Sequence, residues 1–190
     1  LEFLKEKEYN HIKYFYFKTA MSMSQNADMA VRNSTGDYVC FIGDDDAVCR
    51  NIGDCARWMK AKGIDALRSL YLQYSWNEKP DGSCNGTLMY DYEIGFSYRE
   101  KSPKEELKRV LRQGVPDFRD MAKFYHGIIS RDLINKMHKI GGTCFPGVTP
   151  DMSSAVSLSF LIKKYVVVNI PVVIPGMSKM VGGGVMGKVL

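Results

Sequence analysis

Three adjacent aspartates, Asp44, Asp45 and Asp46, follow an apolar run and Gly43 in the segment "GDYVCFIGDDDAV". Two carboxylates about 4 Å apart repel each other by roughly 4 kcal/mol at an effective dielectric constant of about 20. Three neighbours therefore either turn outward into water or share a cation. Carboxylates suit Mg²⁺ or Mn²⁺, which complete their coordination shells with water and substrate phosphate. The triplet indicates a site for a divalent ion and a diphosphate or a solvated turn, and the two are evenly balanced because Asp is common in turns.

The residues before the triplet place it at the end of a strand. Tyr38 to Ile42 form a continuous apolar run, typical of a strand buried on both faces of a parallel sheet. Ligands of open parallel sheets bind beyond the carboxyl ends of the strands. We therefore expect Gly43 and the aspartates to lie at the rim where such a sheet binds ligands.

Strand and helix patterns alternate along the rest of the chain, as in an α/β domain with a mainly parallel sheet. Strands are expected at residues 12–17, 38–42, 65–76, 124–130 and 166–174, and residues 87–100 are expected to be extended. Helices are expected before a stop at residues 33–36, and at residues 51–62, 102–114, 131–142 and 149–165. Expected helix boundaries include Ser102 with Glu105 in a capping box, Ser130 and Thr149 as caps, and Gly63 as a stop.

A further carboxylate, Asp151, opens the last of these helices, directly after Pro150. A carboxylate in a first helical turn stabilises the helix dipole by about 0.3–1 kcal/mol. On the residues alone this dipole role is the better explanation of Asp151.

Two segments together resemble a known family. The stretch "NADMAVRNSTGDYVCFIGDDD" is similar to the core signature of the inverting glycosyltransferases of family 2, which have the GT-A fold. The later stretch "FPGVTPDMSSAVSLSFLIKKYVVVNIPVVIPG" is similar to the acceptor-side segment of that family. The resemblance implies that residues 1–190 form a single partial glycosyltransferase catalytic domain, an incomplete GT-A-like α/β sandwich. The nucleotide-binding segment of the family, with its Pro-Thr-Tyr-Asn-like turn, would then lie upstream of Leu1. The metal motif departs from the family pattern, because Gly43 stands where its first Asp is expected.

The resemblance also implies the chemistry: displacement at a sugar anomeric carbon with inversion, with a nucleoside diphosphate leaving. The implied roles are metal binding of Mn²⁺ or Mg²⁺ by Asp46 and Asp44, donor binding by Arg32, Asn33, Asp44 and Asp45, and general base catalysis by Asp151. Arg32 and Asn33 fit equally well as a helix end that faces solvent. His126, at the end of an expected strand, is a candidate for the acceptor pocket, although a structural histidine is the more common case. His11 and His138 have no supporting partners in the sequence.

Composition limits the classes of partner and compartment. The net charge of +5 is spread along the chain without a basic block, which argues against a nucleic-acid partner. Five cysteines without a CxxC pair indicate neither a disulfide framework nor a zinc site, and favour a reducing compartment. We expect a nucleotide-sugar donor, a glycan or lipid-linked acceptor and a cytoplasmic location, with peripheral association at the inner face of the membrane as a further option. The alternatives are a non-catalytic carbohydrate- or partner-binding module and a nucleotidyltransferase, although the sequence has no glycine- and lysine-rich phosphate loop.

Overall fold

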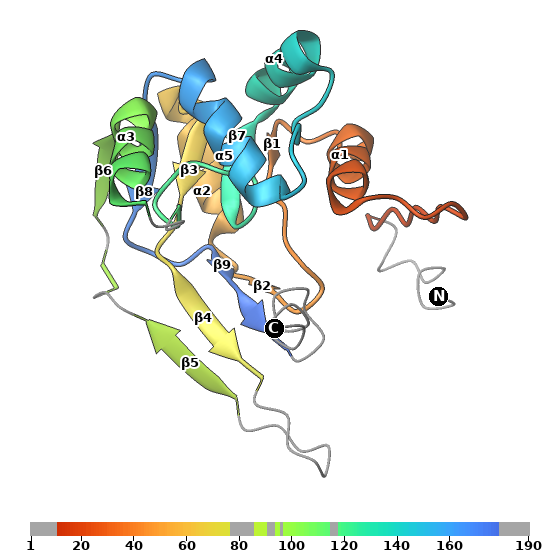
Figure 1. Ribbon diagram of the computed structural model, residues 1–190. Helices are drawn as coiled ribbons and strands as arrows, with labels where there is room; N and C mark the ends of the chain where they lie inside the picture. Colours follow the sequence, from red (N-terminus) through yellow and green to blue (C-terminus); the bar gives the residue numbers. More distant parts are fainter. Residues whose placement is uncertain (1–10, 77–85, 91–93, 96, 115–117, 179–190) are drawn as a thin grey trace.

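A computed structural model describes residues 11–76, 86–90, 94–95, 97–114 and 118–178 of the chain (Figure 1). These residues form a mixed α/β structure around a sheet of five strands, in the order β1-β7-β3-β8-β6. The strands are β1 (Tyr38–Val39), β7 (Gly127–Ser130), β3 (Ala66–Arg68), β8 (Tyr165–Val168) and β6 (Tyr98–Lys101).

The expectation of a mainly parallel sheet was wrong. In this sheet only β3 and β8 pair in parallel, whereas β7 is antiparallel to both β1 and β3, and β6 is antiparallel to β8. A continuous apolar run indicates that a strand is buried on both faces, but it does not indicate whether the strand pairs in parallel or antiparallel. Strands β1, β3 and β8 nevertheless point the same way, so their carboxyl ends lie at one edge of the sheet.

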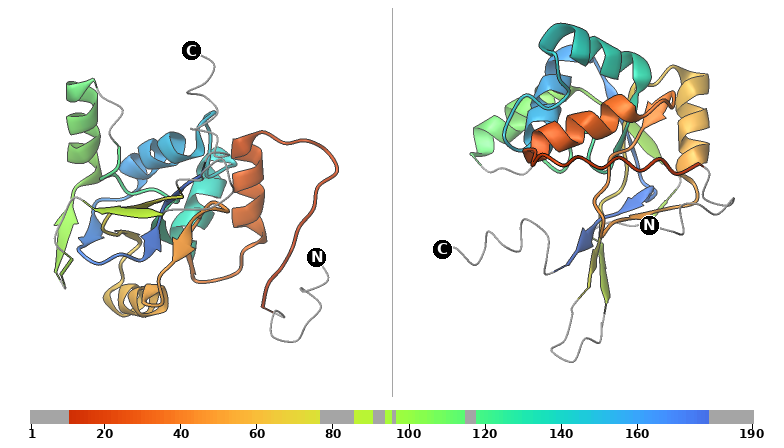
Figure 2. Two further views of the ribbon diagram at one scale, coloured as in Figure 1. Left: turned by 90° about the horizontal axis from the view of Figure 1, so that it is seen from below. Right: turned by 90° about the vertical axis from the view of Figure 1, so that its right-hand side faces the viewer.

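Helices cover both faces of the sheet, and alternate strand residues pack against them. One core contains Ala66, Ile129 and Val167 with residues of α1 (Met23–Asn33), α4 (Arg131–Gly141) and α5 (Pro150–Leu161). The other contains Leu67 and Ile128 with residues of α2 (Ile52–Lys62). Helix α3 (Pro103–Gln113) lies beside α5. The result is a helix–sheet–helix sandwich (Figure 2).

Two expected strands are each divided in two. Residues 65–76 form β3 and then β4 (Leu72–Ser75), which pairs with β5 (Thr87–Tyr90) and β10 (Gly176–Met177) in a second sheet. Residues 166–174 form β8 and then β9 (Val173–Ile174), which pairs with β2 (Ala47–Val48). Pro171, which has no N–H to donate, lies in the break between β8 and β9. The β4–β5 hairpin projects away from the helices (Figure 1).

The strand expected at residues 12–17 is absent. These residues take no strand conformation, and Tyr14 and Tyr16 are more than half exposed. Aromatic content favours a strand only where a sheet edge is available to pair with it, and none of the described strands pairs with this segment.

The helices begin and end largely where their capping residues predict. The side chains of Ser102 and Ser130 accept hydrogen bonds from the first turns of α3 and α4, and Gly63 ends α2 in the left-handed conformation. Thr149 occupies the N-cap position of α5, but its side chain makes no capping bond. Among the described residues, none of the helices has both the length and the apolar character needed to cross a bilayer.

Candidate functional site

The acidic loop, residues 43–46, connects β1 to β2 at the edge where the carboxyl ends of β1, β3 and β8 lie. Two main-chain hydrogen bonds hold the segment before the loop against the residues that precede β7. The Phe41 N–H donates to the Phe124 oxygen at 3.2 Å, and the His126 N–H donates to the Phe41 oxygen at 3.0 Å. The expectation that the aspartates follow a strand is thus confirmed, although β1 itself covers only two residues.

The side chain of Asp46 is almost fully enclosed, with 1% of it exposed. Its Oδ2 accepts hydrogen bonds from the Gly43 N–H at 2.6 Å and lies 2.8 Å from His126 Nε2. Its Oδ1 accepts a hydrogen bond from the Gly176 N–H at 2.7 Å. Burial raises the pKa of Asp46, but hydrogen bonds from His126, Gly176 and Gly43 outweigh burial and lower the pKa to about 2. Asp46 is therefore an ionised carboxylate whose two oxygens are already engaged.

Asp44 and Asp45 are the more accessible carboxylates. Asp44 is exposed. Asp45 is half-buried, and its Oδ2 accepts a hydrogen bond from the Ser178 N–H at 3.1 Å while its carbonyl oxygen accepts one from Trp76 Nε1 at 3.2 Å. These contacts fix the main chain of the loop and leave further lone pairs on both carboxylates for a ligand.

Tyr125 and His126 cover the acidic loop from the β7 side. His126 has a φ of 61°, the left-handed region that non-glycine residues seldom adopt, and this backbone directs its imidazole at Asp46. The rings of Tyr125 and His126 are in contact, with centroids 3.9 Å apart and planes tilted by 45°. Burial, followed by the charges of Asp46, Asp151 and Asp45, raises the pKa of the Tyr125 hydroxyl. Sequence reasoning selected His126 but missed Tyr125, whose only signal was its position beside His126 in "FYHG".

Asp151, in the first turn of α5, belongs to the same electrostatic environment. Burial raises its pKa, Lys123 and His126 lower it, and the negative charge of Asp46 raises it again. Lys123 is itself buried, with its ammonium 4.7 Å from the centre of the Phe118 ring. Among the predicted site residues, the structure therefore places Asp44, Asp45, Asp46 and His126 at the acidic loop, with Asp151 within electrostatic range of it.

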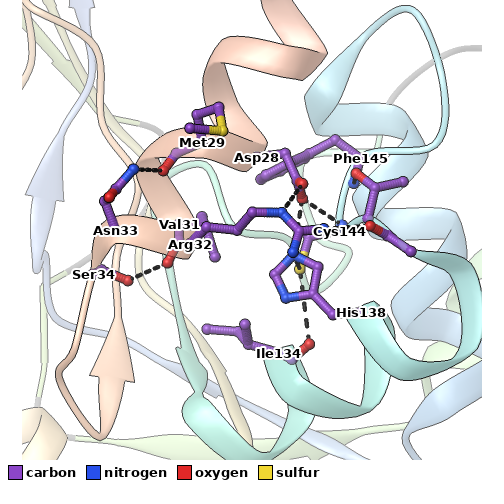
Figure 3. Close-up of polar contacts among 12 residues, drawn as sticks. Asp28, Met29, Val31, Arg32, Asn33, Ser34, Ile134, His138, Cys144 and Phe145 are labelled. Atoms are coloured by element: carbon purple, nitrogen blue, oxygen red, sulfur yellow. Dashed lines mark hydrogen bonds and ion pairs between the residues drawn. The ribbon is translucent and has the colours of Figure 1, made fainter. Parts of the chain in front are cut away.

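Arg32 and Asn33 lie elsewhere, at the carboxyl end of α1 (Figure 3). Arg32 Nε donates to Asp28 Oδ2 at 2.7 Å, and the guanidinium also donates to the Gly142 oxygen. Asn33 Nδ2 donates to the Met29 oxygen at 2.8 Å. Within the described part of the chain, neither side chain contacts the acidic loop, and both have partners that fix the helix end.

Five hollows of the described surface are lined by none of these four carboxylates. A hollow of about 480 Å³ lies at the amino ends of β3 and β8, where Trp58, Lys62 and Asp65 contribute to its lining. Beside the acidic loop, Lys123 and His126 line a cavity of about 10 Å³, which is room for one water molecule at most. A substrate at the acidic loop would therefore bind along the open rim of the sheet.

No protein-family model matches the chain, and no curated protein matches it. The chemistry of the site must be judged from its residues. Two accessible carboxylates, a buried ionised one and a fourth carboxylate with a raised pKa form a strongly negative group. Such a group can bind a hard divalent cation and can also take a proton from a hydroxyl.

Proposed function

We propose that the protein is an inverting, metal-assisted glycosyltransferase with a GT-A-like fold, which moves a sugar from a nucleotide-sugar donor to a glycan or lipid-linked acceptor. The observation that supports the proposal is that Asp151, in the first turn of α5, lies within electrostatic range of Asp46 and His126 at the acidic loop. The sequence resemblance assigns the metal and donor to the first of these segments and the base to the second. A cytoplasmic location belongs to the same proposal.

The oxygen ligands of the acidic loop suit Mn²⁺ or Mg²⁺. The carboxylates that would bind the ion differ from those that the sequence resemblance implies. Asp44 and Asp45 retain free lone pairs, and magnesium sites usually take one or two carboxylates together with water and substrate phosphate. Asp46 would have to give up His126 or Gly176 to bind the ion. We therefore assign the ion to Asp45 and Asp44, and we assign to Asp46 the structural role of fixing the loop through its hydrogen bonds. When bound, the ion supplies neutralisation of the charge that develops on the leaving diphosphate.

Asp151 is suited to the role of general base. Its carboxylate takes the proton of the acceptor hydroxyl as that oxygen bonds to the anomeric carbon and the bond from that carbon to the diphosphate breaks. A base works best when its pKa is nearer to the working pH, and burial moves the pKa of Asp151 in that direction. Lys123 and His126 lower the same pKa and so partly offset the effect of burial.

A non-catalytic binding module is the second candidate, and the saturation of Asp46 is the observation that favours it. A carboxylate that only organises a loop would have the same buried hydrogen bonds. The two candidates differ at Asp151, because a binding module does not need a general base at that position.

The test is release of nucleoside diphosphate from common nucleotide sugars, with and without Mn²⁺, by the open reading frame that contains this chain. We expect Mn²⁺-dependent release that D151N reduces by a factor of about 10² or more, since a positioned general base contributes about 10²–10⁴-fold. D45N should also reduce the Mn²⁺-dependent release, because it removes a ligand of the proposed ion. D132N is the matched control, because Asp132 also lies in a first helical turn, that of α4, but is exposed and beside the other hollow. Full activity in D151N, or no release with any donor, would count against a transferase and in favour of the binding module.

A further inference from the structure

Three side chains from separate elements meet at a second place, on the helix layer of α1 and α4 (Figure 3). Asp28 comes from α1, His138 from the last turn of α4, and Cys144 from the connection between α4 and α5. One donor atom from each lies within 4.8 Å of the other two. We call this group the Asp28–His138–Cys144 cluster.

Asp28 and Cys144 both approach the same atom, Nε2 of His138. His138 Nε2 lies 3.0 Å from Asp28 Oδ1 and 3.6 Å from Cys144 Sγ. A nucleophilic Cys–His–Asp arrangement would need the thiol and the carboxylate on opposite ring nitrogens. Convergence on one nitrogen is instead the arrangement of ligands around a shared cation.

The separations agree with a tetrahedral ion. Zinc bonds of about 2.3 Å to sulfur and about 2.0–2.1 Å to nitrogen put those two atoms about 3.6 Å apart at the tetrahedral angle. The Sγ to Nε2 distance in the cluster is 3.6 Å. The 3.0 Å separation of the carboxylate oxygen from Nε2 is somewhat shorter than a tetrahedral edge and needs an outward shift of a few tenths of an ångström.

The surroundings resemble an outer coordination shell. Arg32 binds the other oxygen of Asp28, and the main-chain N–H of Cys144 donates to Asp28 Oδ1 at 2.8 Å, so the carboxylate is oriented from two sides. The Cys144 side chain is fully enclosed, whereas the side chains of Asp28 and His138 remain 12% and 17% exposed. Asp28 and Thr143 also line a hollow of about 430 Å³, which provides an entry path.

We propose that the Asp28–His138–Cys144 cluster is a Zn²⁺ site, with Asp28 Oδ1, His138 Nε2 and Cys144 Sγ as ligands and water in the fourth position. Thiolate and imidazole select zinc over Mg²⁺ or Ca²⁺, which prefer oxygen. On binding, the thiol proton passes to solvent and the imidazole coordinates in its neutral form. The site is separate from the acidic loop and independent of sugar transfer, and it ties α1 to the α4–α5 connection.

Cobalt titration of the purified full chain tests the proposal, because Co²⁺ replaces zinc and a thiolate ligand gives a near-ultraviolet charge-transfer band. We expect such a band in the unaltered protein, its removal by one equivalent of Zn²⁺, and its absence from C144S. C55S is the matched control, since Cys55 is likewise a buried free cysteine but lies on α2 in the other core. A band that survives in C144S, or is lost in C55S, would overturn the assignment, as would no band in the unaltered protein.

A second variant keeps the test decisive if C144S fails to fold. H138Q changes a partly exposed side chain, and we expect it to lose the cobalt band while its circular dichroism matches that of the unaltered protein. Zinc should also raise the melting temperature of the unaltered protein but not that of H138Q, because only a ligand of the folded state shifts that temperature. Equal zinc shifts in both proteins would refute the site. None of these measurements uses a nucleotide sugar, so the proposed transferase activity can fail without affecting them.

Discussion

At the scale of single residues, the contact between His126 and Asp46 does most to shape the acidic loop. A buried carboxylate is stable only when hydrogen bonds replace its lost hydration, and His126 supplies one of those bonds at 2.8 Å. The left-handed backbone of His126, which costs of order 1 kcal/mol for a non-glycine residue, is the geometry that makes this bond. Local strain and a buried hydrogen bond are therefore coupled at one residue.

We expect H126A to lower the free energy of unfolding by about 1–3 kcal/mol, because the buried Asp46 carboxylate loses one of its hydrogen bonds. H126N should recover part of this loss, because Asn tolerates the left-handed region better than Ala and its amide can donate a hydrogen bond. Urea unfolding of the three proteins measures the difference. If H126A and H126N are equally destabilised, the hydrogen bond to Asp46 is not the reason.

Replacement of Asp151 should reduce activity without lowering stability, unlike replacement of a structural residue. Burial raises its pKa, so its ionised form is less favourable in the folded chain than in water. D151N should therefore melt at or above the temperature of the unaltered protein while losing nucleoside diphosphate release. For a chain of this size, 1 kcal/mol corresponds to roughly 2–4 °C. Calorimetry in parallel with the activity assay provides the check, and a D151N protein that melts several degrees lower would assign Asp151 a structural role.

At the scale of elements, helix boundaries could be read from the sequence because they depend on local chemistry. Ser130 accepts the hydrogen bond from Leu133 N–H that a cap residue provides, and Gly63 adopts the φ of 62° that ends α2. Strand pairing depends on partners far away in the chain, so β7 between β1 and β3 left no local signal. The break between β3 and β4 is of the same kind, because it separates strands of different sheets.

The acidic loop could be predicted in part for the same reason. The position of the aspartates after β1 follows from a local apolar run, whereas the engagement of Asp46 by His126 joins residues 80 positions apart. The sequence also showed no sign of the partners of His138, because Asp28 is 110 positions away in the chain. The family resemblance implied a donor role for Arg32, with a helix end that faces solvent as an equal alternative. Its hydrogen bond to Gly142 depends on the packing of α1 against residues far away in the chain, which the sequence does not show.

The short strand β10 is expected to control the acidic loop. A side chain at Gly176 would overlap the main-chain oxygen of Asp45, and the Gly176 N–H also donates to Asp46. We expect G176A to displace the loop, to lower stability by about 1–3 kcal/mol, as overpacking usually does, and to reduce Mn²⁺-dependent activity.

The matched control for this prediction is G63A, at a position where an added Cβ meets no atom within 4 Å. Gly63 has a positive φ, so its replacement should cost about 1–2 kcal/mol through backbone strain while activity is unchanged. Chemical denaturation and the diphosphate assay separate the two effects. Comparable loss of activity in both variants would mean that general destabilisation, rather than the loop, is responsible.

At the scale of the whole molecule, the sheet separates two cores, and the acidic loop lies at its edge rather than in either core. Because the loop lies outside the cores, its stability depends on hydrogen bonds and charge more than on apolar burial. The change in the free energy of unfolding with falling pH therefore measures how much the ionised carboxylates stabilise the loop.

The sign of that response follows from the pKa of Asp46, which is about 2 in the folded chain against an ordinary value of 3.8. A carboxylate with a lowered pKa stabilises the folded state above its ordinary pKa, and this contribution is lost as the pH falls toward the folded value. The shift corresponds to about 2 kcal/mol, gained fully above about pH 5 and lost between about pH 4 and pH 2. Asp151 has a raised pKa and therefore acts in the opposite direction, with its folded state relatively favoured by protonation.

The contribution of Asp46 can be isolated as the difference in unfolding free energy between the unaltered protein and D46N, because the titration of Asp151 largely cancels in that difference. We expect the difference to be about 2 kcal/mol larger at pH 6 than at pH 2, as measured by urea unfolding at each pH. D44N is the matched control, since it removes a carboxylate from the same loop but Asp44 is exposed. A difference that does not vary between these pH values would mean that Asp46 is not held as an ionised carboxylate. The geometry of the acidic loop would then not depend on the charge of Asp46.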